Sequence, residues 1–488
     1  MSGQISTSNA SHVAPSVLQR LALHLARPVD ADTQARAVLH VVDWLGQSVY
    51  ATTQPAAAGF MAARMAFGAA PSVPKCRSIC GREAASGEAS QVLMLNAAVG
   101  NILEMDDLHR TSILHPGPII VPAAIAVAES IGASGAELLR AIVRGYEATI
   151  RIGRALGTSH YRFFHNTSTC GSFGAAAAAA SLLGLDVERT VWALANAGSR
   201  TGGLWQMRHE ACETKSLHNA LAAQSGVEAA QLALHGVRGP SRFLEGPQGL
   251  FAAMTDGADA NDVLRAPLDS WLIHEVSFKP WPACRHAHPC IDAALAARSA
   301  LEAAGHRVDA ITSIDIGTYR SAIDFCDKPN PQTTLEAKFS LQHCVAAVLA
   351  HGRPEMQHFE AASLADPALA RWRSIVRVSE RVEMSAAFPT HYAASVAFGL
   401  RDGATIAHTQ ADAWGDPEWP LAPDDVMSKA RLLLASVGIR DDSRIASILD
   451  STRALQQSSD CRNWTAQWPS ANELTAGSGH ANAVRRAA

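Results

Sequence analysis

Four short segments stand out from an alanine-rich sequence because they concentrate residue types that bind anions or move protons. They span residues 101–117, 160–171, 208–218 and 278–290. Histidine changes its charge near neutral pH, and lysine and arginine bind carboxylates. Together these side chains favour proton transfer on an anionic substrate. The candidate residues in these segments are Glu104, Asp106, His109, Arg110, His115, His165, Lys215, His218, Lys279, Cys284, Arg285 and His288.

The positions of these segments favour an anion site, but a structural role explains them too. Pro116, Pro118 and Pro122 predict a helix that begins near Pro122, and the segment 160–171 also leads into a helix. A helix N-terminus presents free N–H groups and attracts anions. Solvated, well-capped loops use the same residue types. The residues alone therefore leave both interpretations open.

Two of the segments have the composition of metal sites. The run from Cys284 to Cys290 contains two cysteines and two histidines, which are preferred zinc ligands. The acids at 104, 106 and 107 suit Mg²⁺. However, Lys279 and Arg285 would repel a dication, and histidine and arginine beside the acids suit ion pairing better. We therefore expect no metal at either place.

Composition and missing motifs exclude several classes of protein. The chain has 488 residues and a formal net charge of −4, without a Lys/Arg run of five, so we expect neither a nucleic-acid nor a membrane partner. Its longest apolar runs are well short of the ~20 residues of a membrane span. Nine scattered cysteines and no apparent signal peptide favour a cytoplasmic location. P-loop, dinucleotide-binding, serine-hydrolase and zincin motifs are absent from the sequence.

Hydrophobic periodicity predicts a mainly α protein. The helical pattern covers residues 1–275 and returns at 416–456, whereas residues 276–415 are predicted to form a smaller α+β domain. Residues 457–488 are rich in Ser, Asn, Gly and Ala and are expected to be poorly ordered. The predicted helices include Leu138–Leu156, opened by a Ser134–Glu137 capping box, Val187–Ala197 after the cap Asp186, Gly171–Leu183, Lys215–Leu234, Ala287–Ala303, Leu335–His351 and Val426–Val437. The predicted strands are Ile311–Ile316, Ile375–Met384 and a hairpin of Ser395–Leu400 with Thr405–His408.

The same segments, together with two others, resemble the motifs of the MmgE/PrpD family in the order of that family. This family includes 2-methylcitrate dehydratase, cis-aconitate decarboxylase and iminodisuccinate epimerase. The resemblance extends from about residue 16 to about residue 440. The matching stretches run from Leu95 to Gly117, Pro122 to Ala124, Thr214 to His218, Leu244 to Phe251, Phe278 to Asp292 and Ala337 to His343.

The resemblance implies a large helical domain built from both chain ends, a smaller inserted α+β lid domain, a homodimer and no cofactor. By motif position it implies catalytic roles for His115, His165, Lys215, Lys279 and Asp106. The substrate-binding residues that we expect beside them are Glu104, His109, Arg110, His218, Cys284, Arg285, His288 and His343. The sequence departs from its decarboxylase and dehydratase relatives at positions 108, 109, 284 and 343.

The family resemblance implies a lyase that dehydrates or decarboxylates a small di- or tricarboxylate. Negative charge would develop on a carbon next to a carboxyl group, with His115 as the general acid or base and His165 as a second proton carrier or oxyanion donor. Lys215 and Lys279 would bind carboxylates, although a lysine crowded by cations could also act as a base. One alternative is an isomerase that epimerises a dicarboxylate such as iminodisuccinate with His115 and Lys279. Another is a carboxylate-binding homologue without catalysis.

Overall fold

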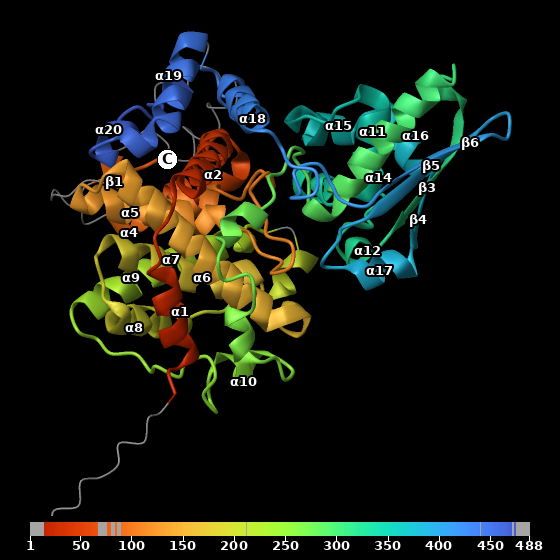
Figure 1. Ribbon diagram of the computed structural model, residues 1–488. Helices are drawn as coiled ribbons and strands as arrows, with labels where there is room; N and C mark the ends of the chain where they lie inside the picture. The colour runs from red at the N-terminus through yellow and green to blue at the C-terminus, as the bar shows by residue number, and fades with distance from the viewer. Residues whose placement is uncertain are drawn as a thin grey trace, which may run out of the picture.

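The computed structural model describes residues 14–66, 76–79, 83–84, 89–210, 212–439, 441–470 and 473–474. These residues form a mainly α protein with a four-stranded mixed sheet (Figure 1), as the periodicity predicted. Two large hydrophobic cores organise it. The first core takes residues from Val17 to Phe278 and again from Leu421 onward, whereas the second lies within Trp281–Leu400. That the part with the second core acts as a lid stays a prediction.

The first core is built around helix α7 (Asn166–Leu182), which packs against α6 (Gly135–Tyr161) and α9 (Thr214–Leu234). Small residues make this close packing possible. A Cβ on Gly174 would lie 1.9 Å from Thr149 Oγ1, and one on Gly226 would lie 2.5 Å from the Ala175 Cβ. The alanine and glycine content of this region therefore brings three helices close together, and two of them begin beside the candidate site.

The remaining helices of the first part surround these three. α2 contacts α18 and α19, so the two ends of the chain meet (Figure 1). A pair of two-residue strands, β1 (Cys76–Arg77) and β2 (Glu83–Ala84), lies before α4. The helices are α1 (Val17–Leu25), α2 (Ala31–Ala51), α3 (Ala58–Ala66), α4 (Ala89–Val99), α5 (Gly117–Ile131), α8 (Val187–Gly198), α10 (Leu250–Met254), α18 (Pro423–Ser436), α19 (Asp442–Arg453) and α20 (Cys461–Thr465).

Local capping signals were predicted correctly at two helices and wrongly at one. The Ser134–Glu137 capping box opens α6, and Asp186 caps α8. The predicted helix start near Pro122 is wrong, because α5 begins at Gly117. The Gly117 N–H donates to Asp107 Oδ1 at 2.8 Å. This hydrogen bond satisfies a free N–H group at the N-terminus of α5, which therefore begins more than one turn before the predicted start.

The second core packs helices against a sheet with strand order β4-β3-β5-β6. β3 (Ile311–Thr318) pairs in parallel with β4 (Val376–Glu380) and antiparallel with β5 (Ala394–Leu400), and β5 forms the predicted hairpin with β6 (Thr405–Gln410). α11 packs against this sheet and α14. The helices are α11 (His288–Ala303), α12 (Arg320–Cys326), α13 (Thr334–Lys338), α14 (Leu341–His351), α15 (Ala361–Leu364), α16 (Pro367–Ser374) and α17 (Val382–Ala387).

Two elements of this part differ from the predictions. The expected strand 375–384 ends at Glu380, because α17 follows and buries Met384 beside Tyr319 and Tyr392. The expected helix 335–351 is two helices, because Ser340 is extended and its hydroxyl caps α14 by accepting from the His343 N–H.

The C-terminal segment departs from the expected disorder as far as residue 470. Trp464 and Trp468 are buried, and the Trp468 ring lies 5.7 Å from that of Trp44. The Gly135 N–H donates to the Ser458 carbonyl at 2.9 Å. Two buried tryptophans thus attach this segment to the first core, despite its polar composition. Residues 475–488 lie outside the described residues.

No helix in the described part of the chain is both long enough and apolar enough to span a bilayer. The cysteines that the structure describes are all free thiols.

Gly135→Ala tests the attachment of the C-terminal segment. A Cβ at residue 135 would lie 1.7 Å from the Leu455 carbonyl oxygen, so the backbones must separate. We expect the free energy of unfolding to fall by about 1–3 kcal/mol in chemical denaturation. Gly59→Ala is the control, because a Cβ there meets nothing within 4 Å and should stabilise α3 by about 0.5–1 kcal/mol. Equal stability of the two variants would contradict the predicted clash.

Candidate active site

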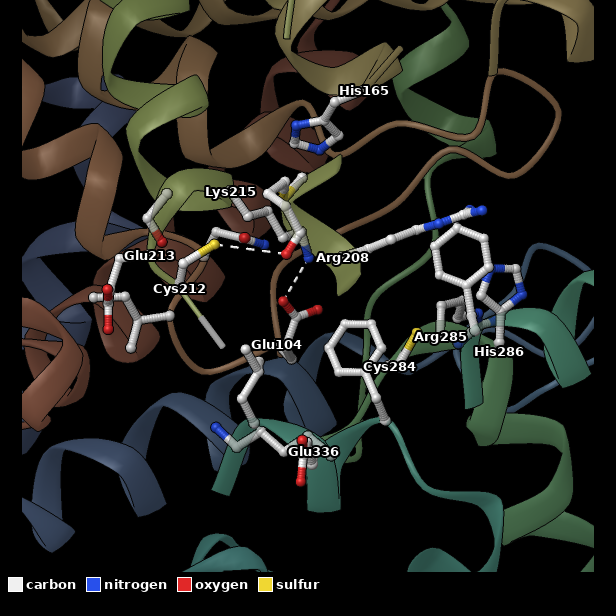
Figure 2. A pocket seen from close by; sticks show the side chains of 18 of the residues that line it. Glu104, His165, Arg208, Cys212, Glu213, Lys215, Cys284, Arg285, His286 and Glu336 are labelled. Carbon is white, nitrogen blue, oxygen red and sulfur yellow. Dashed lines mark hydrogen bonds and ion pairs between the residues drawn. The ribbon is translucent and has the colours of Figure 1, made fainter. Parts of the chain in front are cut away.

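A cavity of about 710 Å³ is lined by both parts of the protein. From the first part come the loop 101–115, the start of α7 and the segment 205–216. From the second come residues 284–286, the segment 324–339 and Tyr392. Figure 2 shows Glu104 and Lys215 near its centre, with Cys284, Arg285 and His286 on one side. This volume is within the ~300–1,000 Å³ typical of small-molecule sites.

A chain of alternating charges forms the base of this cavity. Glu104 Oε1 lies 2.5 Å from Lys215 Nζ, and Glu104 Oε2 lies 3.7 Å from Lys279 Nζ. Lys279 Nζ lies 3.4 Å from Asp106 Oδ1. Lys279 and Asp106 are fully buried beneath the cavity wall, whereas Glu104 and Lys215 reach the cavity itself.

Glu104 occupies an unusual backbone conformation, with φ of 58°. This left-handed region is unfavourable for a residue with a Cβ. Buried lysines hold the turn, because Lys279 Nζ donates to the Glu104 carbonyl at 3.3 Å and Lys338 Nζ donates to the Leu103 carbonyl at 3.1 Å. The carboxylate is thereby aimed at Lys215 rather than along the loop.

His115 is oriented by the acids that precede it. Its Nδ1 lies 2.9 Å from Asp106 Oδ2 and 2.9 Å from the Asp107 carbonyl oxygen. Two acceptors at Nδ1 favour a proton there, which leaves Nε2 as the atom that can take or give a proton. The side chain is 14% exposed and lines the cavity.

Asp107 fixes the loop that carries these residues. Its carboxylate accepts hydrogen bonds from Tyr146 and the Gly117 N–H and lies 2.7 Å from His40 Nδ1. Burial lowers the pKa of His40 to about 4, more than its contact with Asp107 raises it, so this histidine is neutral at pH 7. Asp107 is thus a structural anchor and not a metal ligand.

His165 lies at the N-terminus of α7, and its Nδ1 is 3.2 Å from His218 Nδ1. Its Nε2 is buried and has no hydrogen-bond partner in the described residues. Burial, and then Lys215 and His218, lower the pKa of His165 well below its usual value. His165 is therefore a neutral group that can offer one hydrogen bond to a ligand in the cavity.

The charge states of the central residues follow from burial and from their partners. Burial alone would raise the pKa of Glu104 and Asp106, but the neighbouring cations outweigh it and lower both values. Burial would lower the pKa of Lys215, but Glu104 and Asp106 outweigh it and raise that value. The raised pKa keeps Lys215 cationic at neutral pH, which favours a role in binding carboxylates over a role as a base.

Several predicted site residues do not line the cavity because other partners hold them. His109 is bonded to Ser112 and Glu275, and Arg110 forms ion pairs with Asp412 and Glu418. His288 bonds the Ala283 carbonyl, and His343 bonds the His358 carbonyl and Arg373. These four side chains do not line the cavity, so the structure does not support direct substrate-binding roles for them. His218 contacts His165 from behind the wall, whereas Cys284 and Arg285 do line the cavity.

The predicted zinc-like run does not form a cluster of ligands, since His288 is turned to a backbone carbonyl. The group with metal-binding geometry in the described residues is His391, Asp412 and Glu418. Arg110 already pairs with both of these carboxylates, so the group does not fit a cation.

Sequence reasoning missed several cavity residues. Lys338 is 2% exposed, lines the cavity and forms no ion pair in the described part of the chain. Burial lowers its pKa to about 8, although Glu104 acts in the opposite direction. Its place in the stretch Ala337–His343 was the signal that could have identified it. Four of the other missed residues are aromatic, and no local pattern marks them: Tyr161, Trp205, Phe325 and Tyr392.

Models of the MmgE/PrpD N-terminal domain and the MmgE/PrpD C-terminal domain match residues 22–262 and 281–454. The chain belongs to the MmgE/PrpD family. Its curated relatives include cis-aconitate decarboxylases of Mus musculus and Homo sapiens, each 28% identical over 75% of this chain and 76% of the relative. A cis-aconitate decarboxylase-like protein, oryM of Aspergillus oryzae, is 27% identical over 75% of this chain and 80% of its own length.

Lys338→Met tests the buried lysine of this MmgE/PrpD protein. The folded protein binds fewer protons at Lys338 than the unfolded chain between about pH 8 and pH 10.5, so the stability of the wild type rises over this window. The variant lacks that rise. We expect the stability advantage of Lys338→Met over the wild type to shrink by about 2 kcal/mol between pH 7 and pH 10 in chemical denaturation. A pH-independent difference would show that the pKa of Lys338 is not lowered in the folded protein.

Proposed function

We propose that this MmgE/PrpD protein is a cofactor-free lyase that dehydrates or decarboxylates a small di- or tricarboxylate. The single observation that supports this most strongly is His115, which is fixed at Nδ1 by Asp106 and has Nε2 available in a cavity beside Lys215. A proton carrier next to a fixed cation suits a reaction in which charge develops beside a carboxyl group. The similarity to cis-aconitate decarboxylases supports the same reaction class.

In this proposal the substrate binds with one carboxylate at Lys215, where it competes with Glu104. Lys338 supplies a second positive charge below pH 8. Among the described residues, His165 Nε2 and the Tyr392 hydroxyl have no hydrogen-bond partner, and both residues line the same cavity. The hydroxyl is a neutral donor, and Nε2 is one in the tautomer in which Nδ1 accepts from His218. Charged and neutral donors together stabilise an anionic intermediate better than water does, because they are already oriented.

The proton steps differ between the two lyase reactions. In decarboxylation, the C–C bond breaks, its electron pair stays on the α-carbon and CO₂ leaves. His115 then gives its Nε2 proton to that carbon. In dehydration, His115 Nε2 removes the α-proton and the hydroxyl group leaves with a proton from a second donor. Asp106 stabilises the imidazolium form in both cases.

An epimerase remains the second candidate, because His115 and His165 provide two potential proton carriers in one cavity. The proton pair expected for this reaction, His115 with Lys279, does not fit, since Lys279 is fully buried and paired with Glu104 and Asp106. Incubation in D₂O with di- and tricarboxylates, followed by NMR, separates the reactions. Deuterium incorporation without loss of water or CO₂ would contradict the lyase and favour the epimerase.

His115→Ala tests the proposed proton carrier. We expect kcat to fall by about 10²–10⁴-fold on the acid that the screen identifies, because the variant lacks the group that moves the proton. His351→Ala is the control, because His351 is an exposed histidine at the end of α14, outside the cavity. Unchanged turnover in His115→Ala would refute the catalytic assignment.

Lys215→Met tests the carboxylate-binding cation. Loss of a charge-assisted hydrogen bond of about 1.5–3 kcal/mol should lower kcat/KM by roughly 10–100-fold, with much of the change in KM. Arg444→Met is the control, because Arg444 forms an ion pair with Glu473 at 2.7 Å outside the cavity. We expect that control to lose stability and to keep the wild-type KM. The assignment fails if both variants have the same KM.

A further inference from the structure

One wall of the cavity is formed by three aromatic side chains from separate elements. Tyr161 ends α6, Trp205 begins a short 3₁₀ helix (Trp205–His209) and Phe325 lies in α12. The Trp205 ring is 5.4 Å from Tyr161 and 5.7 Å from Phe325, and the Tyr161 and Phe325 rings are 6.0 Å apart. We call these three residues the aromatic wall.

The aromatic wall is not part of either hydrophobic core, so packing inside a core does not account for these three residues. Tyr161 and Trp205 belong to neither core, and Phe325 only packs against the edge of the second. All three residues line the cavity and are half-buried. Apolar surface that faces a cavity gains free energy when a ligand covers it, so these faces favour an apolar ligand group.

The aromatic wall begins directly beside the reacting groups. The Trp205 ring lies 4.7 Å from the ring of His165, and the Phe325 ring lies 5.0 Å from that of His286. Figure 2 shows Arg208 extending toward His286, and its guanidinium lies 4.8 Å over the Phe325 ring. A group attached to the substrate skeleton can therefore reach the aromatic wall while its carboxylate stays at Lys215.

Little charge opposes an apolar group at this wall. Burial, and then Lys279, lower the pKa of His286 to about 3, so the side chain is neutral at pH 7. Its Nδ1 lies 2.6 Å from the Tyr319 hydroxyl, which satisfies it. The Arg208 guanidinium contacts the wall at Phe325, and Arg208 lies on the exposed rim.

We propose that the substrate carries an alkyl or aryl substituent larger than methyl on the skeleton that bears its carboxylates, and that the aromatic wall binds this substituent. The inference rests on the proposed function, because it concerns the other end of the same substrate. The carboxylates need only the end of the cavity formed by Glu104, Lys215 and Lys338. The remaining volume and the aromatic wall determine which carboxylic acid is preferred.

The test is a series of 2-substituted citrates and aconitates in which the substituent is hydrogen, methyl, butyl or benzyl. With the full-length wild type, we expect kcat/KM to rise by about 10-fold or more from methyl to butyl or benzyl. Trp205→Ala and Phe325→Leu should flatten the series, so that the ratio of kcat/KM between the benzyl and the unsubstituted acid falls toward one. Trp419→Ala is the control, because this exposed tryptophan lies outside the cavity and should leave the series unchanged.

The outcomes separate this inference from the proposed function. If the unsubstituted acid is turned over and larger substituents lower kcat/KM, the inference is overturned and the lyase assignment stands. If no acid is turned over, the lyase assignment fails, and calorimetric binding of the same acids decides the inference. Tighter binding of the butyl and benzyl acids that is lost in folded Trp205→Ala supports it, and equal binding across the series overturns it.

Discussion

The active-site architecture depends on one buried chain of opposite charges. Glu104 and Asp106 are matched by Lys215 and Lys279, and these residues come from a loop, a helix start and the junction between the two parts. Burying any one of these charges alone would be strongly unfavourable, so each requires its partner. This constraint holds the three segments in one place and explains why Glu104 tolerates a left-handed backbone conformation.

The same charge balance determines what the cavity can accept. Glu104 already satisfies Lys215, so an incoming carboxylate must compete with an ionised side chain. Lys338 and the polar atoms of His165 and Tyr392 that have no partner among the described residues offset that competition. In the proposed function, anion binding therefore relies on several convergent donors, and the apolar side of the cavity selects among acids that share the same carboxylates.

Predictions that depended on neighbouring residues were mostly successful, whereas some of those that depended on side-chain direction were not. The capping box at Ser134 and the hairpin of β5 and β6 involve contacts a few residues apart, so the local pattern was sufficient. His109 and Arg110 have suitable types and positions for a site, but their partners Glu275 and Asp412 are far away in sequence. No local pattern indicated that those partners would hold them away from the cavity.

The sequence by itself determined that the protein is mainly helical, that polar segments rich in His and Lys interrupt it, and that its motifs follow those of the MmgE/PrpD family. Periodicity, capping and motif order are properties of short stretches, and they survive without knowledge of the fold. Only the tertiary structure decided which charges pair, that Lys338 is buried and that Tyr161, Trp205 and Phe325 meet. Desolvation and ring packing depend on residues that are distant in the chain, and the folded cavity is where they first come into contact.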